Sequence, residues 1–143
     1  MVAKQLSVFI ENRQGRLHEV LDVLKENKIN ILSLSLADTT EYGLLRLIVN
    51  DAEKGKDKLT FAGFSTMLTD VLIIKIEHKI GSLQTLLESL AEMEINIEYM
   101  YGLSIDGEEA FVVLKPSKLQ EALNALIEKG IKTLSTDDIK VIK

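Results

Sequence analysis

The feature that most constrains this chain is an internal repeat. The segment IENRQGRL, residues 10–17, is followed by INI at residues 29–31, and IEHKIGSL, residues 76–83, is followed by INI at residues 95–97. Both landmarks are displaced by the same number of residues, since 76−10 and 95−29 are each 66. Two separated matches that share one offset indicate a duplicated structural unit, so both copies are expected to fold in the same way.

Each copy begins with the pattern of a strand, a helix and two more strands. From the end of each repeated segment, at Leu17 and at Leu83, apolar residues recur at i, i+3, i+4 and i+7, the spacing of one face of a helix. They are Leu17, Val20, Leu21 and Leu24 in the first copy and Leu83, Leu86, Leu87 and Leu90 in the second. Runs rich in branched residues predict strands at 6–10, 30–37 and 44–49, and at 71–76, 96–105 and 110–114.

The end of each copy predicts a second helix and a closing strand. A stripe from Leu119 to Ile127 predicts the helix of the second copy, with Ser117 and Gln120 at capping-box spacing and Gly130 as its stop. In the first copy, residues 51–62 contain Gly55 and a cluster of Lys and Asp, which predicts a weaker helix. Closing strands are expected at 64–68 and 131–142, where the offset is 67 and one residue has been inserted.

These elements predict an α+β fold of two tandem βαββαβ units, each a four-stranded antiparallel sheet with two helices on one face. We expect domains at 1–70 and 71–143, joined rigidly because residues 68–71 leave almost no linker.

The second strands of the two copies place their apolar residues on opposite faces. Leucines stand at the even positions 32, 34 and 36 in the first copy, and apolar residues stand at the odd positions 97, 99, 101 and 103 in the second, although the repeat offset is even. Either a bulge restores the register or the uncovered sheet faces differ.

Composition excludes several classes of function. The chain has no cysteine, which excludes disulfides and thiolate sites and makes a cytoplasmic location the default. No apolar run approaches the roughly 20 residues that cross a bilayer, so no membrane partner is expected. The 17 Lys and Arg are dispersed among 22 Asp and Glu, so no nucleic-acid partner is expected either. No metal-ligand, Walker or dinucleotide motif appears, and we name no cofactor, no metal and no catalytic residue.

On these residues the chain resembles the ACT domain, a ligand-sensing module of amino-acid metabolism with a ferredoxin-like fold, present here as a tandem pair. The resemblance rests on ENRQGRL with KINI and on EHKIGSL with EINI; family loops usually carry proline before the glycine, where this chain has Gln14 and Ile80. It implies a regulatory, allosteric site for a free amino acid at the loop between first strand and first helix, completed by a neighbouring ACT unit. It also implies a homodimer, a partner enzyme of amino-acid metabolism, and no active site of its own.

The loop leads into a helix N-terminus, whose free N–H groups and dipole suit a carboxylate. We expect Gly15 and Gly81 to allow close approach of the ligand, and Asn12 with Asn30 to hold its charged groups if the strand ends converge at one edge. The full expected set is Asn12, Arg13, Gln14, Gly15, Arg16, Leu17 and Asn30 in the first copy and His78, Ile80, Gly81, Ser82 and Asn96 in the second.

Simpler interpretations stay open for the same residues. The glycines serve turns, Asn30 and Asn96 serve Asx turns, Asn12 caps the loop, and His78 and the arginines are solvated. Two other functions also stay open. One is an assembly module without ligand; the other is an acylphosphatase-like enzyme that uses Arg13 or Arg16 with Asn30, although the glycine-rich loop of that family is missing.

Overall fold

The chain forms two compact units. The structure, a computed structural model, describes residues 1–11, 13–38, 41–77, 79–105 and 109–141. The first unit consists of Lys4–Thr69 with Asp137–Lys143, and the second consists of Asp70–Thr136 with Met1–Ala3. Each end of the chain therefore belongs to the unit formed mainly by the other half of the sequence.

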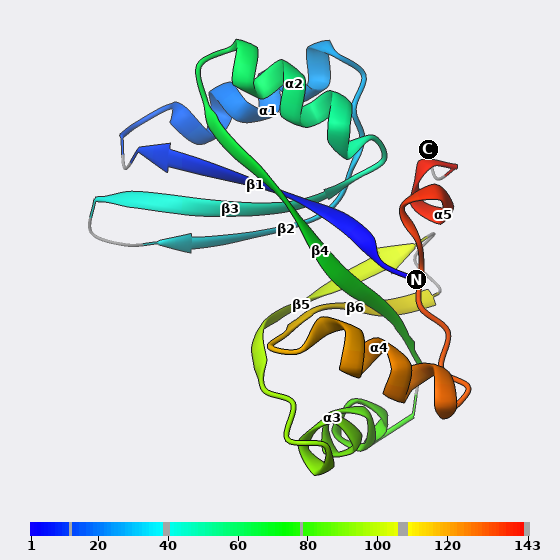
Figure 1. Ribbon diagram of the computed structural model, residues 1–143. Coiled ribbons are helices and arrows are strands. Elements are labelled where there is room, and N and C mark those ends of the chain that lie inside the picture. Colours follow the sequence, from blue (N-terminus) through cyan, green and yellow to red (C-terminus); the bar gives the residue numbers. More distant parts are fainter. Residues whose placement is uncertain (12, 39–40, 78, 106–108, 142–143) are drawn as a thin grey trace. The chain divides into compact units, whose positions relative to one another are not determined.

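The first unit has the predicted order of elements. They are β1 (Ala3–Glu11), α1 (Arg16–Glu26), β2 (Ile31–Asp38), β3 (Tyr42–Val49), α2 (Ala52–Phe61) and the start of β4 (Ser65–Ile76). The strand order is β2-β3-β1-β4, and β3 runs antiparallel to both β1 and β2. Both helices cover one face of the sheet (Figure 1). The core between them contains Val8, Val20, Leu24, Leu47 and Leu59.

The second unit repeats this arrangement with the end of β4, α3 (Ser82–Glu92), β5 (Ile97–Ile105), β6 (Glu109–Pro116) and α4 (Leu119–Glu128). Strand β6 is antiparallel to β4 and to β5, and the core contains Leu72, Ile74, Leu90, Leu114 and Leu126. The predicted α+β class, with two tandem ferredoxin-like units, is confirmed. None of the helices in the described ranges is long and apolar enough to cross a membrane.

A single strand joins the two repeats. The strands predicted at 64–68 and 71–76 are one element, β4, which runs without interruption from Ser65 to Ile76. Its first part belongs to the first unit and its second part to the second. The prediction of almost no linker is confirmed.

The closing strand predicted at 131–142 is wrong. It is reduced to one antiparallel bridge between Thr133 and Ile74, with the N–H of Leu134 donating to the carbonyl of Ile73 at 3.0 Å. The chain then forms the short helix α5 (Thr136–Lys140). Two aspartates, at 137 and 138, lie in its first turn, where the helix dipole favours negative charge, and this signal outweighs the strand pattern.

The capping box expected for α4 is also wrong, and α2 is a regular helix despite its glycine and charged residues. Helix α2 is regular over ten residues, is capped by Asp51, and is as long as α4. Its Gly55 lies where a Cβ atom would be 3.1 Å from Cδ2 of Leu6, so glycine here serves close packing. The capping box of α4 does not form, because Oγ of Ser117 accepts a hydrogen bond from the N–H of Asn96 at 3.1 Å.

The parity difference between the second strands is a difference between the two uncovered faces. Both strands have a register shift at the same place, between Ile31 and Ser33 and between Ile97 and Tyr99. Directly paired residues share a face of the sheet. Leu34 pairs with Leu47 of the helix-side core, whereas Tyr101 pairs with a valine, Val113, that lies outside that core. The bulge is common to both copies, so it does not restore the parity.

Candidate functional site

In each unit, the first strand turns through a short loop directly into the first helix. Gly15 and Gly81 are the N-caps of α1 and α3, and both have a φ of 87°, a left-handed conformation that favours glycine. Matched backbone hydrogen bonds shape the two loops: Arg16 N–H donates to the carbonyl of Arg13 at 3.3 Å, and Ser82 N–H donates to that of Lys79 at 3.2 Å. The same loop is therefore built twice.

The helical hydrogen bonds begin after this turn. The N–H of Thr85 donates to the carbonyl of Gly81 at 3.0 Å, and Gly81, the N-cap residue of α3, has no side chain to cap the helix. None of the described residues accepts a hydrogen bond from the N–H groups of Leu83 and Gln84. Such free donors are usual in the first turn of a helix. The N–H of Arg16, a residue of the expected site in the first copy, donates to the carbonyl of Arg13 within its own loop.

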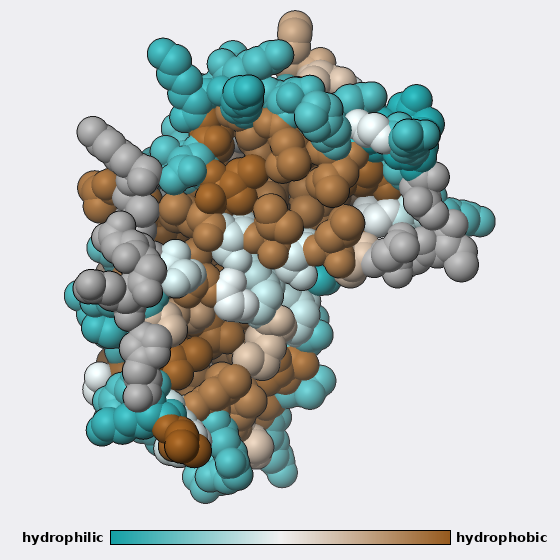
Figure 2. Space-filling model, turned by 180° about the vertical axis from the view of Figure 1, so that it is seen from behind, coloured by the Kyte–Doolittle hydropathy of each residue, from teal (hydrophilic) through white to brown (hydrophobic). Residues whose placement is uncertain are grey.

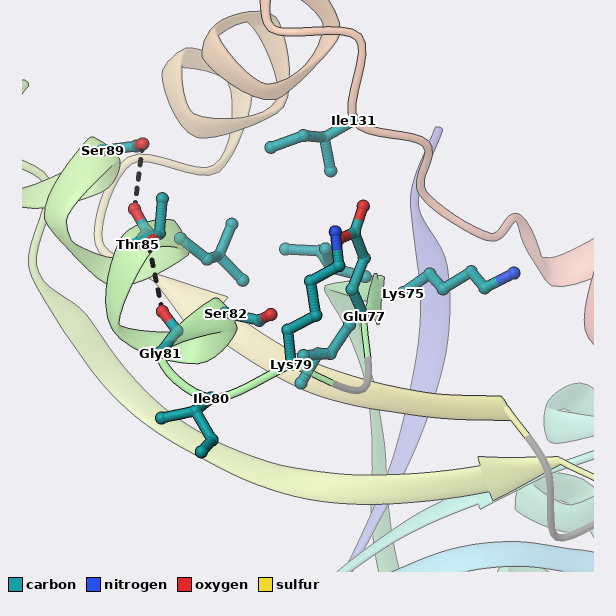
Figure 3. A pocket seen from close by; sticks show the side chains of 12 residues that line it. Lys75, Glu77, Lys79, Ile80, Gly81, Ser82, Thr85, Ser89 and Ile131 are labelled. Atoms are coloured by element: carbon teal, nitrogen blue, oxygen red, sulfur yellow. Dashed lines mark hydrogen bonds and ion pairs between the residues drawn. The ribbon is translucent and has the colours of Figure 1, made fainter.

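A cavity of about 410 Å³ lies beside the loop of the second unit (Figure 3). Its size is within the range of small-molecule sites. Its lining comes from the end of β4, the loop, the first two turns of α3 and the segment after α4: Ile74, Lys75, Ile76, Glu77, Lys79, Ile80, Gly81, Ser82, Thr85, Leu86, Ser89 and Ile131. The cavity has an apolar floor and a polar edge.

Two hydroxyl groups in the lining already have partners. Oγ1 of Thr85 donates to the carbonyl of Gly81 at 3.0 Å, and Oγ of Ser89 donates to the carbonyl of Thr85 at 3.1 Å, as the dashed lines in Figure 3 show. The Ser82 hydroxyl points away from α3, toward the side where Glu77 and Lys79 lie (Figure 3). No described residue is a hydrogen-bond partner of that hydroxyl.

The charged groups of the lining form ion pairs that remain open to solvent. Nζ of Lys79 lies 3.2 Å from Oε2 of Glu77, and Nζ of Lys75 lies 3.1 Å from Oε1 of Glu109. All four side chains are more than half exposed, so these pairs are weak and their charges are available to a ligand.

In the matching region of the first unit, larger side chains of that unit pack against one another. With the offsets of the repeat, Arg16 corresponds to Ser82, and Phe64 corresponds to Ile131. The Cζ atom of Arg16 lies 4.1 Å from the centre of the Phe64 ring, and Nη1 lies 2.6 Å from Oε2 of Glu19. Only 14% of the Arg16 side chain is exposed.

The expected convergence of the first loop and Asn30 does not occur within a unit. Strand β1 ends at Glu11, which pairs with Tyr42 at one end of β3, whereas β2 begins at Ile31, which pairs with Val49 at the other end. These seven steps along a strand span about 23 Å. Strands β1 and β2 are parallel because each runs antiparallel to β3, so the end of β1 and the start of β2 lie at opposite ends of the sheet.

Asn30 and Asn96 instead have matched backbone roles. The N–H of Asn30 donates to Oδ1 of Asn50 at 2.9 Å, and its carbonyl accepts from the N–H of Asn50 at 3.1 Å. Asn96 is bonded in the same way to Ser117. The acylphosphatase-like pairing of Arg13 or Arg16 with Asn30 is excluded within one unit by the same separation.

The other predicted residues lie around the two loops. Arg13 is exposed and lies 3.5 Å from Oε2 of Glu11, while Gln14, Leu17 and Ile80 are also exposed. Asn12 and His78 lie outside the described residues. Within the described ranges, no group of three or more His, Asp or Glu side chains is placed to hold a metal ion.

Sequence reasoning missed nine of the twelve residues that line the cavity, since only Ile80, Gly81 and Ser82 were predicted. The missed residues include Lys75, Glu77, Thr85, Ser89 and Ile131. A usable signal was present in the repeat, because large residues at 16 and 64 are replaced by smaller ones at 82 and 131.

The fold and the twice-built loop are those of a tandem ACT protein, and the sequence bears this out. Residues 1–142 match the family described as the ACT domain pair. The chain therefore belongs to the ACT domain pair family.

Solved structures include a close match. Protein BT0572 from Bacteroides thetaiotaomicron is 37% identical, with a TM-score of 0.92 over 99% of this chain and 98% of that chain. The ligand-free regulatory subunit of aspartate kinase from Thermus thermophilus is 18% identical, with a TM-score of 0.61 over 87% of this chain and 91% of that one. The corresponding subunit from Thermus flavus is 18% identical, with a TM-score of 0.58 over 87% and 90%. The two kinase subunits share the fold. No protein of curated function matches the chain.

Proposed function

We propose that this protein is a non-catalytic regulator that binds a free amino acid at the loop between first strand and first helix. The observation that carries the proposal is the cavity beside Gly81, which adjoins a helix N-terminus with free N–H groups. Membership of the ACT domain pair family supports the same role. We further propose that the protein works in the cytoplasm and acts on an enzyme of amino-acid metabolism.

The charged groups of an amino acid have complementary partners at this site. A carboxylate is stabilised by the first-turn N–H groups of α3 and by the ammonium group of Lys79. The ligand's own ammonium group is stabilised by the carboxylate of Glu77 on the same edge. Both charged side chains are exposed, so they exchange their mutual ion pair for the ligand at little cost.

The two asparagines at the starts of the second strands are available to a ligand that binds between two ACT units. Because Asn30 and Asn96 lie at the far end of their own units, either one contacts a loop-bound ligand only from a neighbouring ACT unit. We propose that a second copy of this chain provides that neighbour in a homodimer. A ligand bound at such an interface stabilises one assembly over another, which is how it changes a partner enzyme.

A thermal-shift screen against the twenty amino acids at millimolar concentration tests the proposal. Ligand at about 100 times its dissociation constant stabilises the native state by about 2.7 kcal/mol, enough to raise the Tm by a few degrees. Glu77→Gln is expected to reduce the shift, and Glu98→Gln, in an exposed ion pair with Lys115, is the matched control. If no amino acid raises the Tm of folded protein, the proposal is wrong.

The alternative function is assembly without a ligand, and exposed apolar surface favours it. Apolar side chains gather on the face shown in Figure 2. Leu34 and Leu36 of the edge strand β2 are 50% and 48% exposed. Under this alternative, Leu36→Lys would abolish dimers in light scattering, and amino acids would leave the dimer unchanged.

For the acylphosphatase-like alternative, we expect no release of phosphate from a simple acyl phosphate.

A further inference from the structure

The two loops share one backbone but differ in the side chains around them. Four matched pairs of positions account for the difference: Arg16 and Ser82, Glu19 and Thr85, Val23 and Ser89, and Phe64 and Ile131. In the second unit all four members line the cavity. In the first unit the long side chain of Arg16 extends over the ring of Phe64 and reaches Glu19.

We propose that the two ACT units divide their tasks: Arg16 occupies the ligand position of the first unit, and the second unit receives an amino acid with an apolar side chain. This inference rests on the proposed function and assigns it to one unit and one class of ligand.

Arg16 has the contacts of a bound cationic ligand. Its guanidinium stacks on an aromatic ring that is only 4% exposed, and its charge is neutralised by Glu19 at 2.6 Å. A free amino acid would have to displace these contacts to enter. Nε of Arg16 is buried and has no hydrogen-bond partner among the described residues. Shortening this side chain therefore breaks no hydrogen bond at Nε with a described residue.

The interior of the second cavity fits an apolar side chain. Its lining contains the apolar side chains of Ile74, Ile76, Leu86 and Ile131. In Figure 3 the charged ends of Glu77 and Lys79 lie close together, and the Lys75 side chain points away from them. The hydroxyl hydrogens of Thr85 and Ser89 are donated to their own helix. A buried polar side chain of a ligand would therefore find few donors and would lose its hydration, whereas an aliphatic side chain gains from burial.

Reciprocal substitutions in the full-length protein test this division. Ser82→Arg places a long cationic side chain at the mouth of the second cavity. Ala91→Arg, which adds the same charge at an exposed position of α3 outside the lining, is its matched control. Arg16→Ser makes the first unit resemble the second. Binding is measured by isothermal titration calorimetry with leucine, isoleucine, valine and methionine, and with aspartate, lysine and serine for comparison.

We expect one ligand per chain, with an aliphatic amino acid bound at least 10-fold more tightly than a charged one. Ser82→Arg is expected to weaken binding at least 10-fold and Ala91→Arg less than 3-fold, and Arg16→Ser is expected to retain the original site. Two equivalent sites in the unsubstituted protein would overturn the inference, as would stronger binding of a charged amino acid. Unchanged binding in Ser82→Arg would overturn it as well.

Amide chemical shifts of the unsubstituted protein provide a test that does not depend on folding of the variants. Ligand is expected to shift the amide signals of Gly81, Ser82 and Thr85, while those of Gly15 and Arg16 stay in place. Shifts confined to the first loop would leave the proposed function intact and contradict the division of tasks. Absence of binding by every amino acid would instead contradict the proposed function, and the division with it.

Discussion

The guanidinium carbon of Arg16 lies 4.1 Å from the centre of the Phe64 ring, and the residues at the two matching positions, Ser82 and Ile131, line an open cavity. The backbones that present them are alike, because Gly15 and Gly81 have the same φ of 87°. The difference between the two sites therefore lies in their side chains and not in the backbone. Duplication of one scaffold, followed by changes at a few positions, is sufficient to produce two chemically different units.

Arg16→Ala is expected to lower the free energy of unfolding by about 1 kcal/mol. A partly desolvated cation–π contact contributes up to about 2 kcal/mol, and the pair with the half-exposed Glu19 adds less than about 1 kcal/mol. Removal of a buried donor without a partner offsets part of this loss. Urea unfolding followed by circular dichroism measures the change. Ser82→Ala should stay within about 0.5 kcal/mol, and equal stability of Arg16→Ala and the parent would show that the stack contributes nothing.

Gly15→Ala and Gly81→Ala are each expected to cost about 1–2 kcal/mol, because a left-handed backbone brings Cβ close to the following carbonyl. Nothing else lies within 4 Å of the added Cβ at either site, so the cost belongs to the backbone alone. Asn tolerates this conformation better, and Gly→Asn should cost less than Gly→Ala at both positions. Gly102→Ala is the control, since that glycine also has open space but has no left-handed φ. A similar loss at all three glycines would mean that backbone strain is not the cause.

Lys28→Gly and Glu94→Gly are expected to stabilise the protein by about 0.5–1 kcal/mol each. These matched residues follow α1 and α3 and have a φ of 58°, which is costly for any residue with a Cβ atom. Glycine removes that cost, although it loses more backbone entropy on folding. Chemical denaturation of the two single variants and of the double variant measures the gain. A double variant less stable than the parent would contradict the prediction.

The sequence was sufficient for the elements whose pattern is local. The helical stripes ending at Leu24 and Leu90 lie where periodicity placed them, and the two strands predicted on either side of Thr69 are both present, joined as one strand. The expected convergence of Asn30 with the loop of its own unit was wrong, because sheet topology decides which strand ends meet and periodicity does not report topology. The role of Arg16 was also missed, since an arginine in a first helical turn looks solvated until the side chain beneath it, Phe64, is known.

Gly55→Val is expected to lower the free energy of unfolding by about 1–3 kcal/mol, the usual range for overpacking. Even a single Cβ atom there would lie 3.1 Å from Cδ2 of Leu6, whose side chain is fully buried. Asp57→Val places the same residue on the exposed side of α2 and should change stability by less than about 0.5 kcal/mol, because Asp and Val have similar helix propensities. The two variants are compared by their urea midpoints. An equal loss in both would show that the effect is not specific to position 55, and only a larger loss at Gly55 supports close packing of α2 on the sheet.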